Sequence, residues 1–258
     1  MEQMKSINRA LEILNCFSYE KPEMGVTDIS KQLNLPKSTI SRLLTALRQH
    51  NFVIKSSASQ KFRLGMKILK LSGIVKPIMD EWVVLARPHL KDLRDKTNET
   101  TALHVIDGDQ RMCIEEFPSL NELRPFLSKG GHYPLHAGSA GKLLLAYQSE
   151  EKRKEILSKR KLPRFTPNTI TNIQDLEKEL SNIRQKGFAL SYQERATFLS
   201  SISAPIRNYE NEVIAALCLH GPSMRLTHQK MLNFKYFVIE TAAKISKELG
   251  FEPQNGQK

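Results

Sequence analysis

The sequence predicts a two-domain chain of the α+β class, with a small winged helix-turn-helix domain at the N-terminus, a helical linker and a larger mixed domain after it. Three observations support this. Residues 25–52 contain two short amphipathic helices separated by a tight break. A basic hairpin pattern follows at residues 52–64. Beyond residue 100, strands in hairpin order are mixed with helices, which is typical of α+β domains.

The segment 25–52 has the pattern of a helix-turn-helix. Ile29 and Leu33 mark the apolar face of the first helix, and Thr27 is placed to cap it. Pro36 suits the start of the second helix, because its φ is fixed and it has no N–H to donate. Apolar residues of the second helix then recur at i, i+3, i+4 and i+7 on one face. They are Ile40, Leu43, Leu44 and Leu47.

The opposite face of the second helix is polar and basic and carries no acidic residue. Such a face can lie in a major groove without repelling phosphates, so we predict that it binds double-stranded DNA. The residues predicted to contact DNA are Lys37, Ser38, Thr39, Ser41, Arg42 and Thr45. The alternative is an ordinary helical hairpin whose polar face is only solvated.

A basic hairpin follows directly, with strands at 52–55 and 61–64 around a turn. This is the position of the wing in a winged helix. Lys55, Lys61 and Arg63 are predicted to contact phosphates there, which adds affinity but reads no sequence. Ahead of the motif, an apolar stripe at helical spacing predicts a third helix for the core of this domain. The stripe consists of Ile7, Ala10, Leu11 and Leu14.

The positive charge of the chain is concentrated near the N-terminus. The 258 residues carry a formal net charge of +12, and residues 1–76 supply +8 of it, with 13 Lys and Arg against 5 Asp and Glu. DNA binding requires such a basic region. The three cysteines are far apart and no C-x-x-C occurs, which argues against a disulfide framework or a zinc finger and predicts a cytoplasmic protein. We find neither an apolar run that could span a membrane nor the apolar stretch of a signal peptide.

Helical patterns continue after the wing at residues 66–75 and 80–86. Pro77 is expected to kink or break this stretch, and Pro88 to start another helix that ends near residue 97. The boundaries that follow are 1–65 for the DNA-binding domain, 66–79 for a linker helix and 80–258 for the second domain.

The second domain opens on a predicted hairpin, with strands at 101–106 and 111–117 around the turn Asp107-Gly-Asp109. Further strands are predicted at 188–193, 200–206 and 213–220. The predicted helices cover residues 139–147, 150–159, 173–186 and 227–249.

Linked motifs along essentially the whole chain resemble the IclR family of bacterial transcriptional regulators. SINRALEIL and LPKSTISRLLTALRQHNFV are similar to the family's winged-helix domain, and GGHYPLHAGSAGKLLLA (130–146) to its most recognisable effector-domain motif. GFALSYQE (187–194), SSISAPI (200–206) and AALCLHGP (215–222) follow in the family's order. The resemblance implies a ligand-responsive regulator with a GAF-like effector-binding domain, assembled as a homodimer or homotetramer.

The resemblance also implies where the effector binds. The residues carried over are Ala137, Gly138, Ser139, Ser191, Ser201, Cys218 and His220. Gly138 allows close backbone approach, and a helix that begins near Ser139 directs free N–H groups and a positive dipole end towards the site. A small carboxylate is therefore the predicted effector. Ser191 and Ser201 stand where some relatives carry Asp and Cys, and Phe198 where Gly is common.

Two other chemistries use the same residues. Cys218 and His220 alternate along a strand and so point to one face; with His136 they could bind a metal such as zinc. They could also serve a hydrolase as nucleophile and base, but both can line a pocket without such a role. The chain has no G-x-S-x-G, no H-E-x-x-H and no dinucleotide fingerprint, so we predict no enzyme and no cofactor.

Three charged residues within or next to these motifs are assigned ordinary roles. Lys142 is predicted to be solvated, because G-x-x-G-K lacks the full Walker spacing. Glu194 and Arg195 could pair with a ligand or a partner, but they are predicted to belong to a surface ion pair that stabilises a loop and contributes little. A DNA-architectural protein without a ligand is a further alternative, but DNA binding alone would not require the large, less basic second domain. One recognition helix reads too few base pairs for genomic specificity. We therefore expect a dimer that binds two DNA half-sites.

Overall fold

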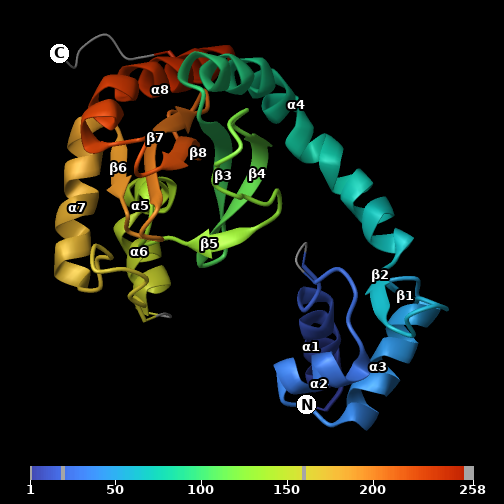
Figure 1. Cartoon of the computed structure of the whole chain (residues 1–258). Helices are drawn as coiled ribbons and strands as arrows, with labels where there is room; N and C mark the ends of the chain where they lie inside the picture. The colour runs from blue at the N-terminus through green and yellow to red at the C-terminus, as the bar shows by residue number, and fades with distance from the viewer. Residues whose placement is uncertain (1, 19–20, 159–160, 253–258) are drawn as a thin grey trace. The chain divides into compact units, whose positions relative to one another are not determined.

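The computed structural model describes residues 2–18, 21–158 and 161–252 (Figure 1). The chain divides into two compact units, Met1–Glu81 and Trp82–Lys258. The predicted domain limits at 65 and 79 remain predictions. No helix in the described part of the chain is both long and apolar enough to cross a membrane.

The N-terminal unit is a winged helix-turn-helix, as predicted. It contains α1 (Glu2–Asn15), α2 (Val26–Leu33), α3 (Lys37–Gln49) and the antiparallel pair β1 (Val53–Lys55) and β2 (Phe62–Leu64). Each of the five elements contributes at least one buried side chain to a small apolar core. Its buried members are Ile13, Cys16, Met24, Ile29, Ile40, Leu44, Val53 and Phe62.

Two local predictions in this unit are wrong. Thr27 does not cap α2: Gly25 is the N-cap residue, and its N–H donates to the Asp28 carboxylate (3.0 Å). The apolar stripe predicted on α1 is also only partly buried. Ile13 is buried, whereas Ile7 and Leu11 are 59% and 54% exposed. An i, i+3, i+4 pattern shows that a face is apolar, but not whether that face meets the core of the same chain.

The predicted break at Pro77 and the predicted new helix at Pro88 are also wrong. A single helix, α4 (Met66–Thr97), runs through both prolines. On either side of Pro88 its buried residues pack onto the C-terminal unit: Val83, Ala86, Leu90 and Leu93. At Pro88 this burial outweighs the one backbone hydrogen bond that an interior proline removes.

The C-terminal unit is built on a six-stranded antiparallel sheet in the order β5-β4-β3-β8-β7-β6. The strands are β3 (Thr100–Asp107), β4 (Gln110–Phe117), β5 (His132–Pro134), β6 (Ala189–Tyr192), β7 (Leu199–Arg207) and β8 (Val213–Pro222). The helices are α5 (Ser139–Ala146), α6 (Glu150–Ser158), α7 (Ile173–Lys186) and α8 (His228–Glu248). The α+β prediction is confirmed, although the three-residue edge strand β5 was not anticipated.

The two faces of the sheet meet different helices, because side chains alternate along each strand. Thr101, which is aligned with Leu219 in the β3–β8 register, donates to the carbonyl of Leu90 in α4 (2.9 Å). Cys218, the next residue of β8, instead lies 3.4 Å (Sγ–Oγ) from Ser139 of α5. Figure 1 shows α8 and the end of α4 on one side of the sheet and α5 and α7 on the other.

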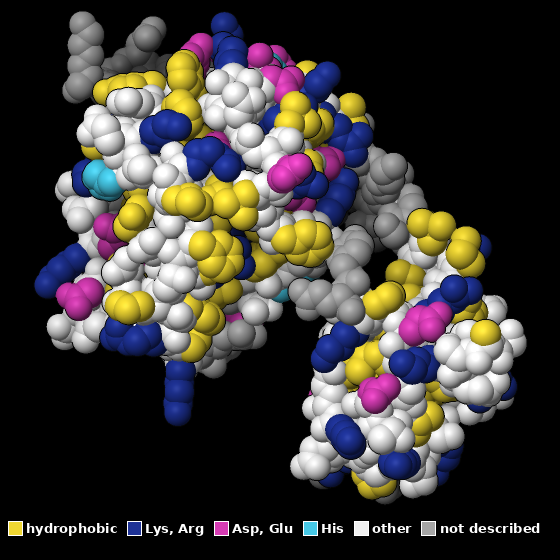
Figure 2. Space-filling view, in the orientation of Figure 1, with side chains coloured by type: hydrophobic (Ala, Val, Ile, Leu, Met, Phe, Trp, Pro, Cys, Tyr) yellow, Lys and Arg dark blue, Asp and Glu magenta, His cyan; other side chains and the backbone are white. Residues whose placement is uncertain are grey.

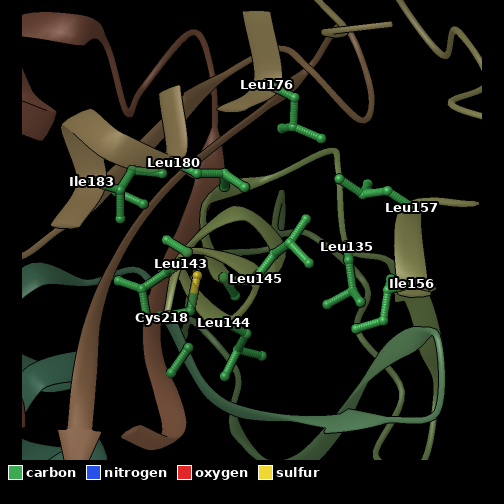
Figure 3. Packing of buried hydrophobic residues seen from close by; sticks show 14 residues of the cluster. Leu135, Leu143, Leu144, Leu145, Ile156, Leu157, Leu176, Leu180, Ile183 and Cys218 are labelled. Carbon is green, nitrogen blue, oxygen red and sulfur yellow. The ribbon is translucent and has the colours of Figure 1, made fainter. Parts of the chain in front are cut away.

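Every residue of α5 is buried, between the sheet and α7. A helix that is apolar nearly all round is expected in such a central place. Figure 3 shows the leucines of α5 in one core with apolar side chains of α6 and α7 and with Cys218 of β8. The members drawn from α6 and α7 are Ile156, Leu157, Leu176, Leu180 and Ile183.

Candidate functional site

The predicted DNA-contacting face of α3 is open to solvent. Ile40 and Leu44 are fully buried, and their burial turns the polar side of the helix outward. Thr39 is half-buried, and the other five predicted residues are exposed: Lys37, Ser38, Ser41, Arg42 and Thr45. The Thr45 hydroxyl donates to the Ser41 carbonyl (2.9 Å), so only its lone pairs and methyl group face outward.

The wing presents its cations in the same way. Lys55, Lys61 and Arg63 are exposed on β1 and β2 and on the turn between them. The Lys55 ammonium lies 5.9 Å from the centre of the Phe62 ring, whose buried side chain anchors the hairpin to the core. Figure 2 shows Lys and Arg side chains distributed over the visible face of this unit, with few acidic ones between them.

The seven residues predicted to bind the effector are all buried around the first turn of α5. Ser139 is the centre of the group: its hydroxyl oxygen lies 2.8 Å from both the Ser201 and the Ser203 hydroxyls. Ser191 is paired with Ser201, and Ser201 with His220, in the strand register. These three side chains therefore form a row across β6, β7 and β8 on the α5 side of the sheet.

The backbone N–H groups at the start of α5 are not free, contrary to the prediction. The N–H of Gly138 donates to the Glu194 carboxylate (3.1 Å), and the N–H of Ser139 to the Ser201 hydroxyl (3.3 Å). The chain thus supplies its own anion to the positive end of this helix. Gly138 itself has a φ of +96°, and a β-carbon there would lie 3.2 Å from the Arg111 guanidinium.

The predictions for Lys142 and Glu194 are wrong. Lys142 is 1% exposed, and its ammonium donates to the carboxylates of Glu194 (2.6 Å) and Glu179 (2.8 Å). Glu194 is 7% exposed and has Lys142, not Arg195, as its partner. A signal was present in the sequence: a lysine within the otherwise small and apolar α5 is buried with its helix, and a buried charge requires a partner.

At this site the sequence analysis missed Arg111, and it assigned Arg195 to a surface ion pair ahead of a ligand contact. Arg111 of β4 is 1% exposed; its Nε donates to the Pro134 carbonyl (3.3 Å), and its Nη1 has no partner among the described residues. The guanidinium carbons of Arg111 and Arg195 lie 5.1 Å and 4.8 Å from the centre of the Tyr133 ring. Burial, with a smaller contribution from Arg195, lowers the pKa of Arg111 to about 10. Across the described ranges, neither arginine forms an ion pair with a carboxylate.

Two neutral histidines stand beside these arginines. The Nε2 atoms of His104 and His220 are 3.3 Å apart, so one donates and the other accepts. Burial, reinforced by the charge of Arg111, lowers the pKa of both imidazoles well below 6.5. His104 Nδ1 has no partner in the described part of the chain. His104, isolated in a strand pattern, carried no sequence signal that would have identified it.

The structure does not assemble the residues of the metal alternative. His136 instead bonds through Nε2 to the Pro163 carbonyl (3.0 Å), stacks on Phe165 and lines a different cleft of about 620 Å³. Within the described ranges, no three His, Cys, Asp or Glu side chains are grouped to hold a metal. Cys218 Sγ lies 3.7 Å from His220 Nδ1, but burial raises the pKa of the thiol, which opposes the thiolate that a nucleophile needs.

Known families and structures match the chain over nearly all of its length. Residues 6–56 match the IclR helix-turn-helix domain, and residues 81–247 the bacterial transcriptional regulator IclR C-terminal domain. The transcriptional regulator XynR of Escherichia coli K12 is 31% identical over 251 residues, 97% of this chain and 99% of XynR.

Two solved structures are similar to the chain over nearly all of its length. The Thermotoga maritima IclR is 26% identical, with a TM-score of 0.73 over 96% of this chain and 100% of that one. An IclR homolog from Microbacterium hydrocarbonoxydans, complexed with 4-hydroxybenzoate, is 26% identical, with a TM-score of 0.80 over 95% of this chain and 98% of that one. The chain therefore belongs to the IclR family, as a ligand-responsive, DNA-binding transcriptional regulator and not an enzyme.

Proposed function

We propose that this regulator binds operator DNA as a homodimer, through the exposed face of α3 and the wing, and that its effector is a small carboxylate bound on the α5 side of the sheet. The observation that carries the effector assignment is Arg111, a buried guanidinium without a carboxylate partner in the described chain. A buried charge costs free energy unless it is paired, so the site of Arg111 favours an anionic ligand.

The chemistry of Arg111 matches a carboxylate. Its planar fork can donate two parallel hydrogen bonds to the two carboxylate oxygens. Because the amino end of α5 is already occupied by Glu194, the guanidinium is the stronger candidate for the anion contact. The predicted loop 137–139 still borders the site, since Gly138 is in van der Waals reach of Arg111.

The neighbouring groups suit the rest of a small polar ligand. His104, His220 and Ser201 offer uncharged donors and acceptors on the same face of the sheet as Arg111. A few placed polar groups in an otherwise apolar surrounding are typical of ligand sites. The relative complexed with 4-hydroxybenzoate, itself a small carboxylate, supports this class of ligand.

The effector assignment is tested by thermal-shift screening of the full chain against small metabolic acids. An acid that stabilises the protein should lose its effect in Arg111→Met and keep part of it in Arg111→Lys. Arg124→Met removes the same charge from an exposed loop and serves as the matched control. Unchanged binding of the acid by Arg111→Met would remove Arg111 from the site.

The DNA assignment is tested on an operator selected from a random DNA pool. Arg42→Ala should weaken operator binding by about 1–3 kcal/mol if Arg42 contacts a base edge. Arg42→Lys, which keeps the charge but not the planar fork, should retain affinity for unrelated DNA and lose discrimination. Gel-shift titrations with operator and unrelated DNA measure both; equal losses on the two DNAs would assign Arg42 to a phosphate instead.

A further inference from the structure

We infer that the effector is a monoanion, with one carboxylate held between Arg111 and Arg195 and an otherwise uncharged body. The inference rests on the proposed carboxylate site and adds the number of charges that the site accepts. It follows from the set of charged side chains packed around the first turn of α5, which we call the α5 charge cluster: Arg111, Lys142, Glu179, Glu194 and Arg195.

The α5 charge cluster is continuous. Gly138 joins its two halves, because its N–H donates to Glu194 and its α-carbon faces Arg111. Glu194 and Arg195 are consecutive residues, and Arg195 reaches the same Tyr133 ring as Arg111. Lys142 completes the cluster by bridging Glu194 to Glu179 of α7. A charge added at any of these positions is therefore felt by the others in a region of low dielectric.

The α5 charge cluster lacks one negative charge. It contains three cations and two carboxylates, and both carboxylates are bonded to Lys142. The other buried carboxylates of the sheet have partners of their own: Glu99 is paired with Arg225 and Glu115 with Arg87. A single carboxylate on the ligand would bring the cluster to neutrality.

In the described part of the chain, the other polar groups that we place at this site are uncharged and offer no cation to a second carboxylate. His104 and His220 are neutral imidazoles, since burial lowers the pKa of both. Cys218 is a neutral thiol, since burial raises its pKa. Ser139 and Ser201 offer hydroxyl groups only. A second ligand carboxylate would therefore leave an excess negative charge in a buried place, which the site disfavours.

The charge of Glu179 determines how many negative charges the cluster lacks. Its side chain is 30% exposed against 9% for Glu194. It lies on α7, and its ion pair is with Lys142 of α5. Without the Glu179 charge, the cluster would lack two negative charges, and a dianion would balance it. Glu179 is thus a specificity-determining residue that does not touch the ligand.

The test is calorimetric binding to the full-length chain of three matched acid pairs: 4-hydroxybenzoate and terephthalate, pyruvate and oxaloacetate, lactate and malate. The wild type should prefer the monoacid of any pair that binds by a factor on the order of ten. Glu179→Gln should shift the ratio towards the diacid by a similar factor. Glu177→Gln removes the same charge from the same helix outside the cluster, where Glu177 pairs with Arg153, and should leave the ratio unchanged.

Arg195→Gln provides a second variant that does not depend on the packing of α7. It removes one cation, so the cluster would be neutral without a ligand, and the preference for 4-hydroxybenzoate over 4-hydroxybenzamide should fall on the order of tenfold. Diacids that bind the wild type as tightly as monoacids, or an equal shift in Glu177→Gln, would overturn the monoanion inference and leave the carboxylate site standing. No binding of any of the six acids would overturn both.

Discussion

Lys142 shows how much a single residue of this site contributes to the fold. Its ammonium is enclosed within α5 and neutralised by Glu194 and Glu179, so its removal leaves the buried Glu194 carboxylate without a cation. Breaking a buried pair by deleting one partner typically costs about 3–5 kcal/mol. We predict a loss of this size for Lys142→Met, measured by urea unfolding of the C-terminal unit.

The control for this prediction is Lys154→Met. Lys154 forms an exposed i, i+4 pair with Glu150 on α6, and such pairs contribute little. Its replacement should leave the unfolding midpoint unchanged. Equal midpoints for the Lys142 and Lys154 variants would mean that the buried pair contributes no more than an exposed one.

His104 and His220 predict an acid-sensitive C-terminal unit. Burial lowers the pKa of both histidines in the folded state, whereas in the unfolded chain they titrate near 6.5. Above pH 6.5 both states are neutral and the stability is fully present. As the pH falls below 6.5, only the unfolded state takes up protons, so the free energy of unfolding decreases, by up to about 1.4 kcal/mol per pH unit for each histidine.

The measurement is urea denaturation between pH 8 and pH 5. His104→Gln keeps a hydrogen-bonding group beside His220 but removes one titrating side chain, so the decrease in stability below pH 6.5 should become shallower. An identical pH dependence in the variant and the wild type would contradict a neutral, buried His104.

At the scale of elements, α3 and the β1–β2 hairpin are predicted to make different kinds of contact with DNA. The exposed face of α3 offers hydroxyl and guanidinium groups suited to base edges, whereas the wing offers exposed cations on a hairpin. Cations that meet phosphates add affinity without sequence preference and release condensed counterions. The two elements should therefore respond differently to salt and to the DNA sequence.

Lys61→Ala should weaken binding to operator and unrelated DNA by the same factor. If Lys61 neutralises one phosphate in each half-site, the slope of log affinity against log salt should fall by about one per contact. Fluorescence anisotropy over a salt series measures the slope. Lys178→Ala, which removes an exposed cation from α7 of the other unit, should leave it unchanged. A loss confined to operator DNA would assign Lys61 to sequence reading.

At the scale of the whole molecule, exposed apolar side chains predict how copies associate. Ile7 and Leu11 of α1 and Leu69 and Ile74 of α4 are between 54% and 63% exposed in the N-terminal unit. Ile7 and Leu11 lie one turn apart on α1, and exposed apolar side chains that lie together mark association sites. A symmetric dimer would cover them and place two α3 helices over two half-sites.

Leu11→Glu should therefore shift the protein towards monomer in sedimentation velocity and weaken operator binding, because a monomer reads only one half-site. Leu120→Glu introduces the same change at a residue that is 73% exposed in the C-terminal unit. It should leave both the N-terminal association and DNA binding intact. A dimer that withstands Leu11→Glu would place the interface elsewhere.

Local sequence patterns were sufficient to predict an element wherever one periodicity of apolar residues dominated the segment. The helix predicted at 173–186 is α7, residue for residue, because its apolar residues repeat at helical spacing and Gly187 follows in a left-handed conformation. The turn at Asp107–Asp109 predicted the β3–β4 hairpin, and the apolar face of α3 predicted which side faces outward. Alternation alone also placed Cys218 and His220 on one side of β8.

Only the tertiary structure decided the features that depend on distant partners. Pro88 does not end α4, because residues around it are buried, and Ile7 and Leu11 in the apolar stripe of α1 stay exposed, because the core of the unit lies on another side of the helix. The charge of Lys142 is buried because Glu194, 52 residues away, is folded against it. Arg111 becomes a candidate anion site for the same reason, because the desolvation and pairing of a charge depend on what the rest of the chain places around it.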